Sequence, residues 1–196
     1  METVRYDTKT ALLVVDVQND FADPQGSLYV KGGEQVVPVI NREAARAQAA
    51  GALVVYTQDW HPEVTPHFHK YGGIWPVHCV RDSWGAAFAP QLRVEGEIVR
   101  KGTGPEDGYS GFSVADLETG SQKPTRLEEL LRRHGIERVV IIGLATDYCV
   151  KETAFDALRA GFTTTVLEEG VRAVNLKESD GVRALDEIRQ AGARVE

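Results

Sequence analysis

The sequence predicts an α/β fold, in which a doubly wound, mostly parallel β-sheet lies between two layers of helices. Short apolar runs of strand length alternate along the chain with segments whose apolar residues recur every three or four positions. Chemically reactive side chains also follow several of these apolar runs. Repeated strand–helix–strand units close by right-handed crossovers, which give a parallel sheet covered on both faces. We therefore expect three layers.

The first half of the chain contains three predicted strands and one predicted helix. The apolar run at 11–15 is expected to form a buried strand. Apolar residues at three- and four-residue spacing then predict a helix over 36–47. A second apolar run predicts a strand at 52–57, and a shorter one predicts a strand at 97–100.

The second half continues the same alternation, with glycines at the ends of two of its helices. In order, the expected elements are a helix at 127–131, a strand at 138–142, a helix at 148–161, a strand at 163–167, a helix with Val182, Leu185 and Ile188 on its apolar face, and an edge strand at 193–195. The pattern contains no repeat and no inter-domain linker. We therefore expect residues 1–196 to form a single domain.

One segment does not fit the alternation. The stretch 58–90 is too long for an ordinary connection and is rich in proline, glycine, histidine and aromatic residues. Long loops in compact domains usually carry function. We expect this one to contribute to a site.

The composition narrows the classes of partner. The formal net charge is −7 and no basic stripe is present, which argues against nucleic acid or an anionic membrane as a partner. No apolar run is long enough to span a bilayer, and the amino-terminal residues lack the apolar core of a signal peptide. We expect a cytoplasmic protein in which both cysteines, Cys79 and Cys149, are reduced.

Reactive side chains follow four of the predicted strands. They are Asp16, Asp59, Lys101 and Cys149. The carboxyl ends of parallel strands open onto the crevice where ligands bind in such sheets. Four reactive residue types at four equivalent positions therefore predict a catalytic site.

Cys149 occupies a predicted strand-to-helix turn, where backbone N–H groups and the helix dipole favour a thiolate and a developing oxyanion. Asp16 is suited to accept the thiol proton, and Lys101 to stabilise the charges. The alternative is that Asp16 caps a turn, Lys101 is solvated and Cys149 is a small core residue. Cys79, in an apolar setting, is expected to be buried and structural.

Asp59 and His61 predict a metal site. Residues two apart in an extended chain share a face, so the two side chains point the same way. From spacing alone, the third ligand is His67, His69 or His78. A set of two histidines and a carboxylate with open positions suits one divalent ion, zinc first and iron or manganese as alternatives. The alternative is that these histidines are surface residues of the loop.

Three aromatic residues lie in predicted loops: Phe21, Trp75 and Tyr109. Such side chains suit a planar aromatic substrate, although they can equally pack the loops onto the sheet. Asn19, Thr146 and Asp147 are candidates to brace the site by hydrogen bonds. His134, beside a glycine at a helix end, is expected to cap that helix.

The motifs resemble the nicotinamidases, amidases that also act on pyrazinamide, within the isochorismatase-like cysteine hydrolases. The matching segments, in family order, are Val-Asp-Val-Gln-Asn-Asp-Phe at 15–21, Thr-Gln-Asp-Trp-His-Pro at 57–62, Trp-Pro-Val-His-Cys-Val at 75–80, Lys-Gly-Thr at 101–103, Tyr-Ser-Gly-Phe at 109–112 and the segment 143–151. The combination of the second and third segments is more specific than the segment around the cysteine.

The resemblance implies an isochorismatase-like fold and a role for each site residue. It implies a triad of Asp16, Lys101 and Cys149, and an oxyanion hole from the backbone amides of Ala145 and Cys149. It further implies a cis peptide before Ala145. The implied metal ligands are Asp59, His61 and His78, with His67 matching a further histidine of some members, and the implied ring sandwich is Phe21 and Trp75.

The function implied by the resemblance is hydrolysis of nicotinamide, and of pyrazinamide, through a cysteine thioester. The metal orients the substrate ring. The partner is thus a small molecule, and members of the family commonly self-associate, so a homo-oligomer is expected. The alternative is an isochorismatase-like amidohydrolase that acts on a ureidoacrylate or carbamoyl compound. The metal set, which such relatives generally lack, argues against that alternative.

Overall fold

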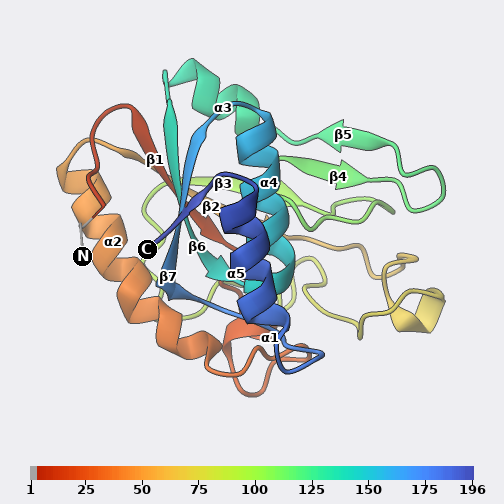
Figure 1. The fold of residues 1–196 in the computed structure, drawn as a ribbon. Helices are drawn as coiled ribbons and strands as arrows, with labels where there is room; N and C mark the ends of the chain where they lie inside the picture. Colours follow the sequence, from red (N-terminus) through yellow and green to blue (C-terminus); the bar gives the residue numbers. More distant parts are fainter. Residues whose placement is uncertain (1–3) are drawn as a thin grey trace.

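The computed structural model describes residues 4–196 and contains a six-stranded parallel sheet with the strand order β3-β2-β1-β6-β7-β8 (Figure 1). The predicted fold class is confirmed. The strands are β1 (Thr10–Val15), β2 (Leu53–Asp59), β3 (Glu97–Lys101), β6 (Arg138–Leu144), β7 (Thr163–Arg172) and β8 (Arg194–Val195). The predicted strand at 193–195 is the edge strand β8.

The helices are α1 (Asn19–Ala22), α2 (Val36–Ala49), α3 (Leu127–Arg133), α4 (Lys151–Arg159) and α5 (Asp180–Gln190). Short 3₁₀ helices cover Gly33–Gln35 and His69–Tyr71, and a π-helix covers Thr146–Val150. A two-stranded antiparallel hairpin, β4 (Ser113–Ala115) and β5 (Gln122–Pro124), projects from the side of the sheet (Figure 1).

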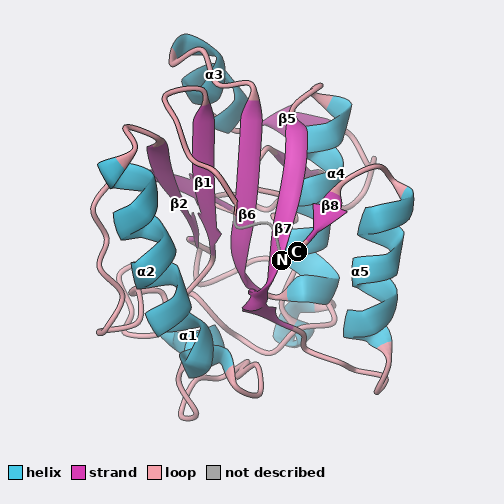
Figure 2. Cartoon of the chain, turned by 60° about the vertical axis from the view of Figure 1, so that its left-hand side comes forward, coloured by secondary structure: helices cyan, strands magenta, loops and turns pink. Residues whose placement is uncertain are grey.

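The sheet is buried on both faces because alternate residues of each central strand point to opposite layers. From β1, Leu12 and Val14 join a core cluster with the apolar face of α2. Leu13 and Val15 join a second cluster with α3, α4 and α5. Figure 2 shows α2 on one side of the sheet and α4 and α5 on the other. Continuous apolar strands are therefore required, which explains why the runs in the sequence do not alternate with polar residues.

The structure departs from the predicted elements at several places. The β4–β5 hairpin was not predicted, and β7 continues to Arg172, beyond the predicted strand at 163–167. The helix predicted at 148–161 begins as a π-helix, and α4 itself starts at Lys151. Phe21, expected in a loop, lies in the one-turn helix α1. Val182, expected on the buried face of its helix, is 66% exposed, because Gly181, with Ala184, Leu185 and Ile188, occupies the inner face of α5. Within the described residues, no helix combines the length and apolarity that crossing a bilayer requires.

Candidate active site

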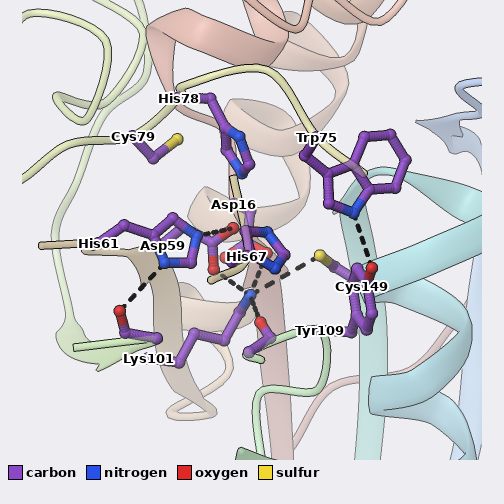
Figure 3. A network of polar contacts seen from close by, with 12 residues as sticks. Asp16, Asp59, His61, His67, Trp75, His78, Cys79, Lys101, Tyr109 and Cys149 are labelled. Carbon is purple, nitrogen blue, oxygen red and sulfur yellow. Dashed lines mark hydrogen bonds and ion pairs between the residues drawn. The ribbon is translucent and has the colours of Figure 1, made fainter. Parts of the chain in front are cut away.

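The four reactive residues meet at the carboxyl edge of the sheet (Figure 3). Asp16 follows β1, Asp59 and Lys101 end β2 and β3, and Cys149 lies in the π-helix after β6. Asp59 and Lys101 are in-register partners across their two strands. The shared strand direction brings the four side chains to one crevice, as expected for this type of sheet.

Asp16 is fully buried, and its two carboxylate oxygens have different partners. Its Oδ1 accepts a hydrogen bond from Thr57 Oγ1 at 2.6 Å. Its Oδ2 lies 2.8 Å from the Lys101 ammonium but accepts no hydrogen bond of good geometry from the part of the chain that is described. Burial raises the pKa of Asp16 to about 6, opposed by Lys101 and supported by the charge of Asp59. Asp16 is thus a carboxylate at neutral pH that can take up a proton.

Lys101 joins the two carboxylates to the cysteine. Its ammonium lies between Asp16 and Asp59, donates to the carbonyl of Gly108, and lies 3.7 Å from Cys149 Sγ. Burial opposes its charge, but the two carboxylates outweigh burial and raise the pKa of Lys101 well above its usual range. Although β3 is three strands away from β6, the long side chain spans the distance. The ammonium therefore persists and compensates charge in a dry site.

Cys149 is buried, yet it lines the cavity at the carboxyl edge. Its Sγ lies within 4.8 Å of a carboxylate oxygen of Asp16 and of Asp59. Burial raises the pKa of the Cys149 thiol well above its usual value, with Lys101 opposing and the two carboxylates adding to the rise. This rise opposes the thiolate that the strand-to-helix turn is expected to favour. A protonated thiol beside an ionised carboxylate needs that carboxylate as a base.

Three imidazoles from the long loop converge beside this cluster, and they belong to His61, His67 and His78 (Figure 3). One ring nitrogen from each lies within 4.8 Å of the others. Each Nδ1 is held by an oxygen: the Gly102 carbonyl at 3.1 Å for His61, an Asp107 carboxylate oxygen at 2.8 Å for His67, and the Pro76 carbonyl at 2.8 Å for His78. The rings thus keep Nε2 for another partner, as histidines do when they bind a metal.

Two further observations fit a cation at this point. His61 Nε2 is buried without a hydrogen-bond partner among residues 4–196 and lies 3.6 Å from Asp59 Oδ2. Burial and the neighbouring His61 lower the pKa of His78 to about 4, so this ring is neutral at pH 7, as a metal ligand must be. His69 is exposed in a 3₁₀ turn and lies outside the group. The structure thus brings together His61, His67 and His78 and leaves His69 out.

Glycine is required where the backbone passes His61. Gly102 has φ +61, and a Cβ there would lie 2.5 Å from His61 Cε1. The same residue supplies the carbonyl that holds the ring. Asp107, which holds His67, carried no signal in the sequence, because adjacent acidic residues in a polar loop, here Glu106 and Asp107, are common.

The cavity beside Cys149 has an aromatic side and an apolar side. Trp75 Nε1 donates a hydrogen bond to Tyr109 Oη at 2.7 Å, and both rings pack near Tyr148. Phe21, Leu28 and Val174 also line the cavity; Phe21 belongs to the core cluster of α2, and Leu28 and Val174 pack against it. All three predicted aromatic residues line the cavity. The sequence did not reveal Leu28, Tyr148 or Val174, because single apolar or aromatic residues in loops are common.

The isochorismatase domain family matches residues 10–196, nearly the whole chain. The chain belongs to the isochorismatase family.

Within this family the chain is similar to nicotinamidases and pyrazinamidases. It is 38% identical to the nicotinamidase of Escherichia coli (strain K12), and the match covers 94% of this chain and 93% of that protein. The solved structure of a pyrazinamidase of Pyrococcus horikoshii in complex with zinc is 40% identical, with a TM-score of 0.85 over 96% of this chain and 98% of that chain. PnC1 from L. infantum in complex with nicotinate is 35% identical, with a TM-score of 0.89 over 98% and 95% of the two chains.

The segment before the cysteine agrees with what the family resemblance implied. The Leu144–Ala145 peptide is cis, and Ala145 lines the cavity with Cys149. Gly143, at the end of β6, has φ +121, and a Cβ there would lie 2.1 Å from the Val15 carbonyl oxygen. Position 143 must therefore be glycine for β6 to lie this close to the end of β1.

The remaining predicted residues have structural contacts. Cys79 is fully buried in the core cluster of α2, and both cysteines are free thiols. His134 Nδ1 lies 2.9 Å from the Leu130 carbonyl at the end of α3, which confirms the expected cap. Asn19 Nδ2 donates to the Trp84 carbonyl, and Asp147 accepts two backbone N–H groups from the segment after β7.

Proposed function

We propose that this protein is a nicotinamidase that hydrolyses nicotinamide, and pyrazinamide, to the carboxylic acid and ammonia. The observation that carries the proposal is a buried thiol, Cys149, that lines a cavity with aromatic residues and lies within 4.8 Å of a carboxylate oxygen of Asp16. The similarity to nicotinamidases over almost the whole chain supports the same substrate class.

In the proposed first half-reaction, Asp16 removes the proton from Cys149, and Sγ attacks the carboxamide carbon of the substrate. The C=O π electrons move to oxygen, and the oxyanion accepts hydrogen bonds from the backbone N–H groups of Ala145 and Cys149. Asp16 then returns the proton to the nitrogen as the C–N bond breaks. Ammonia leaves, and the acyl group remains on Cys149 as a thioester.

In the second half-reaction, Asp16 removes a proton from water, and the hydroxide oxygen attacks the thioester carbon. The C–S bond breaks, the proton returns to the sulfur, and nicotinic acid leaves, which gives up its carboxyl proton to the solvent and becomes nicotinate. Lys101 stays charged throughout and compensates the negative charge that moves between Asp16 and Sγ. Phe21 and Trp75 hold the ring between them, and Tyr109 fixes Trp75 by the indole–phenol hydrogen bond.

The same proposal includes one divalent metal ion, zinc first, with iron and manganese as alternatives. Asp59, His61 and His78 would hold it. His67 would join them, because one ring nitrogen of each of the three histidines lies near those of the others and Asp107 fixes the His67 ring. When bound, such an ion supplies a Lewis acid that orients the nitrogen of the substrate ring. The zinc complex of the similar Pyrococcus horikoshii pyrazinamidase supports the choice of metal.

We further propose that the enzyme is cytoplasmic and forms a homo-oligomer. Size-exclusion chromatography with light scattering measures the assembly, and fractionation of cells measures the location.

The proposed function is tested by ammonia release from nicotinamide, pyrazinamide and a ureidoacrylate, using protein whose metal content has been measured. We expect turnover of the two ring carboxamides and none of the ureido compound. Turnover of the ureido compound alone would replace nicotinamide hydrolysis with the alternative amidohydrolase activity. No turnover of any of them would refute the amidase assignment.

A further inference from the structure

One buried carboxylate near the nucleophile has no part in the proposed chemistry. Asp147 lies two residues before Cys149 in the π-helix and is 7% exposed. Its Oδ1 accepts the backbone N–H of Val174 at 2.9 Å, and its Oδ2 accepts the backbone N–H of Asn175 at 2.8 Å. Both oxygens of one side chain therefore hold two consecutive amides of a segment far away in the sequence.

The segment that Asp147 holds forms part of the cavity. Val174 follows β7, lines the cavity beside Cys149, and packs against the core cluster of α2. Asn175 has φ +54 and accepts the N–H of Gly181 with its Oδ1 at 2.8 Å. A Cβ at Gly181 would lie 2.5 Å from the Ala173 Cβ, so α5 is pressed against the same segment.

The position of Val174 thus depends on two polar attachments rather than on regular structure. From one side Asp147 ties it to the nucleophile turn, and from the other Asn175 ties it to α5. A carboxylate that accepts two N–H groups makes charge-assisted hydrogen bonds, which are stronger than neutral ones.

We propose that Asp147 is a positioning residue and Val174 a specificity-determining residue: Asp147 holds Val174 at a constant distance from Cys149, and the Val174 side chain excludes ring carboxamides that carry an additional substituent on that side. This inference rests on the proposed nicotinamidase function, whose substrate class it makes narrower. Val174 contacts the ring, whereas Asp147 acts only through the segment 173–175.

The test compares four variants on nicotinamide and on its 5-methyl and 6-methyl derivatives: Val174→Ala, Asp147→Asn, the double variant, and Asp116→Asn. Asp116 is a matched control, because its carboxylate also accepts two backbone N–H groups, from Glu118 and Thr119, in an exposed turn. For each variant, the ratio of kcat/KM for a methylated substrate to kcat/KM for nicotinamide is measured.

We expect Val174→Ala and Asp147→Asn each to raise this ratio about tenfold for at least one methylated ring, the scale of one methyl group in an apolar pocket. The ratio in the double variant should exceed the larger of the two single-variant ratios by less than about twofold, because both changes remove the same steric contact. Asp116→Asn should leave the ratio unchanged. An Asp147→Asn variant that slows all three substrates by one common factor would overturn the inference, and so would an unchanged ratio in Val174→Ala.

Hydrogen exchange tests the positioning role of Asp147 without relying on activity. In Asp147→Asn, exchange of the Val174 and Asn175 amides should accelerate at least about tenfold, and in Asp116→Asn it should not. Unchanged exchange would refute the positioning role even if nicotinamide is not a substrate. If Asp147→Asn does not fold, Asp147→Glu, which moves the carboxylate by one methylene, takes its place with the same expected directions. Failure of the wild type to release ammonia from nicotinamide would refute the proposed function and with it the specificity role of Val174, while the exchange measurement would still decide the positioning role of Asp147.

Discussion

The two cysteines of this chain share their burial and differ in their surroundings. Burial raises the pKa of both thiols, Cys79 and Cys149, well above the usual value. Cys149 lines a cavity, with Lys101 Nζ at 3.7 Å. Cys79 is packed in the core, and its Sγ lies 3.9 Å from the Gly85 carbonyl oxygen.

Each cysteine also has its own buried carboxylate. Asp16 Oδ2 is paired with the Lys101 ammonium and accepts no hydrogen bond of good geometry within residues 4–196, whereas both oxygens of Asp20 accept backbone N–H groups, from Cys79 and Ser27. On the proposed function, the neighbouring base and the open cavity are what distinguish Cys149 from Cys79. Four predictions test this contrast.

The largest effect is expected from exchanging the cysteines for alanine. Cys149→Ala should lower ammonia release from nicotinamide at least about 10³-fold, because the attacking atom is lost. Cys79→Ala should keep kcat within about threefold and lower the free energy of unfolding by roughly 1 kcal/mol. Steady-state assays and urea denaturation measure the two. The opposite pattern, with Cys79→Ala inactive and Cys149→Ala active, would show that Cys149 is not the nucleophile.

The second prediction compares the two buried carboxylates, Asp16 and Asp20. Asp16→Asn removes the base and should lower kcat by about 10²- to 10⁴-fold. Asp20→Asn should act mainly on stability, by about 1–3 kcal/mol, because it disturbs backbone hydrogen bonds and no proton transfer. Circular dichroism of both variants during urea unfolding is the control. A larger loss of kcat in Asp20→Asn than in Asp16→Asn would contradict the assignment of the base.

The third prediction concerns the histidines beside Cys149. His61→Ala should weaken binding of zinc, iron or manganese at least about 100-fold, and His69→Ala, a matched change on the exposed side of the same loop, should not. Chelator competition with metal analysis measures this. Equal metal affinity in the two variants would show that the imidazole group does not hold the ion.

The smallest expected effect is on the pH profile. The pKa of Asp16 is raised to about 6, and its carboxylate is the active form. As the pH falls below about 6, Asp16 becomes protonated and kcat/KM should fall about tenfold per pH unit. Thr57→Val removes the hydrogen bond that favours the carboxylate, so the acid limb should move to higher pH. A limb that moves to lower pH would contradict this account of Asp16.

The sequence was sufficient for the elements that depend on periodicity and for the side chains at strand ends. Apolar runs buried on both faces predicted the central strands, and the common direction of parallel strands predicted that Asp16, Asp59 and Cys149 would meet. Lys101 was placed correctly at the end of β3, although its reach across the sheet depends on strand order, which the sequence does not specify.

What the sequence left open depends on the path of the long loop. The spacing of His67, His69 and His78 is compatible with any of them facing His61, and only the folded loop turns His69 outward. The contribution of Asp107 and the apolar lining by Val174 arise from contacts between distant segments, which no local pattern records. The π-helix around Cys149 likewise differs from an α-helix start only in its hydrogen bonding.

The measurement that tests the central claim most directly is acid quenching of the enzyme during turnover of nicotinamide, followed by peptide mapping with mass spectrometry. The account predicts a nicotinoyl group on the peptide that carries Cys149 and none on the peptide that carries Cys79. A nicotinoyl group on Cys79, or turnover with no acylated peptide under conditions that preserve thioesters, would contradict it.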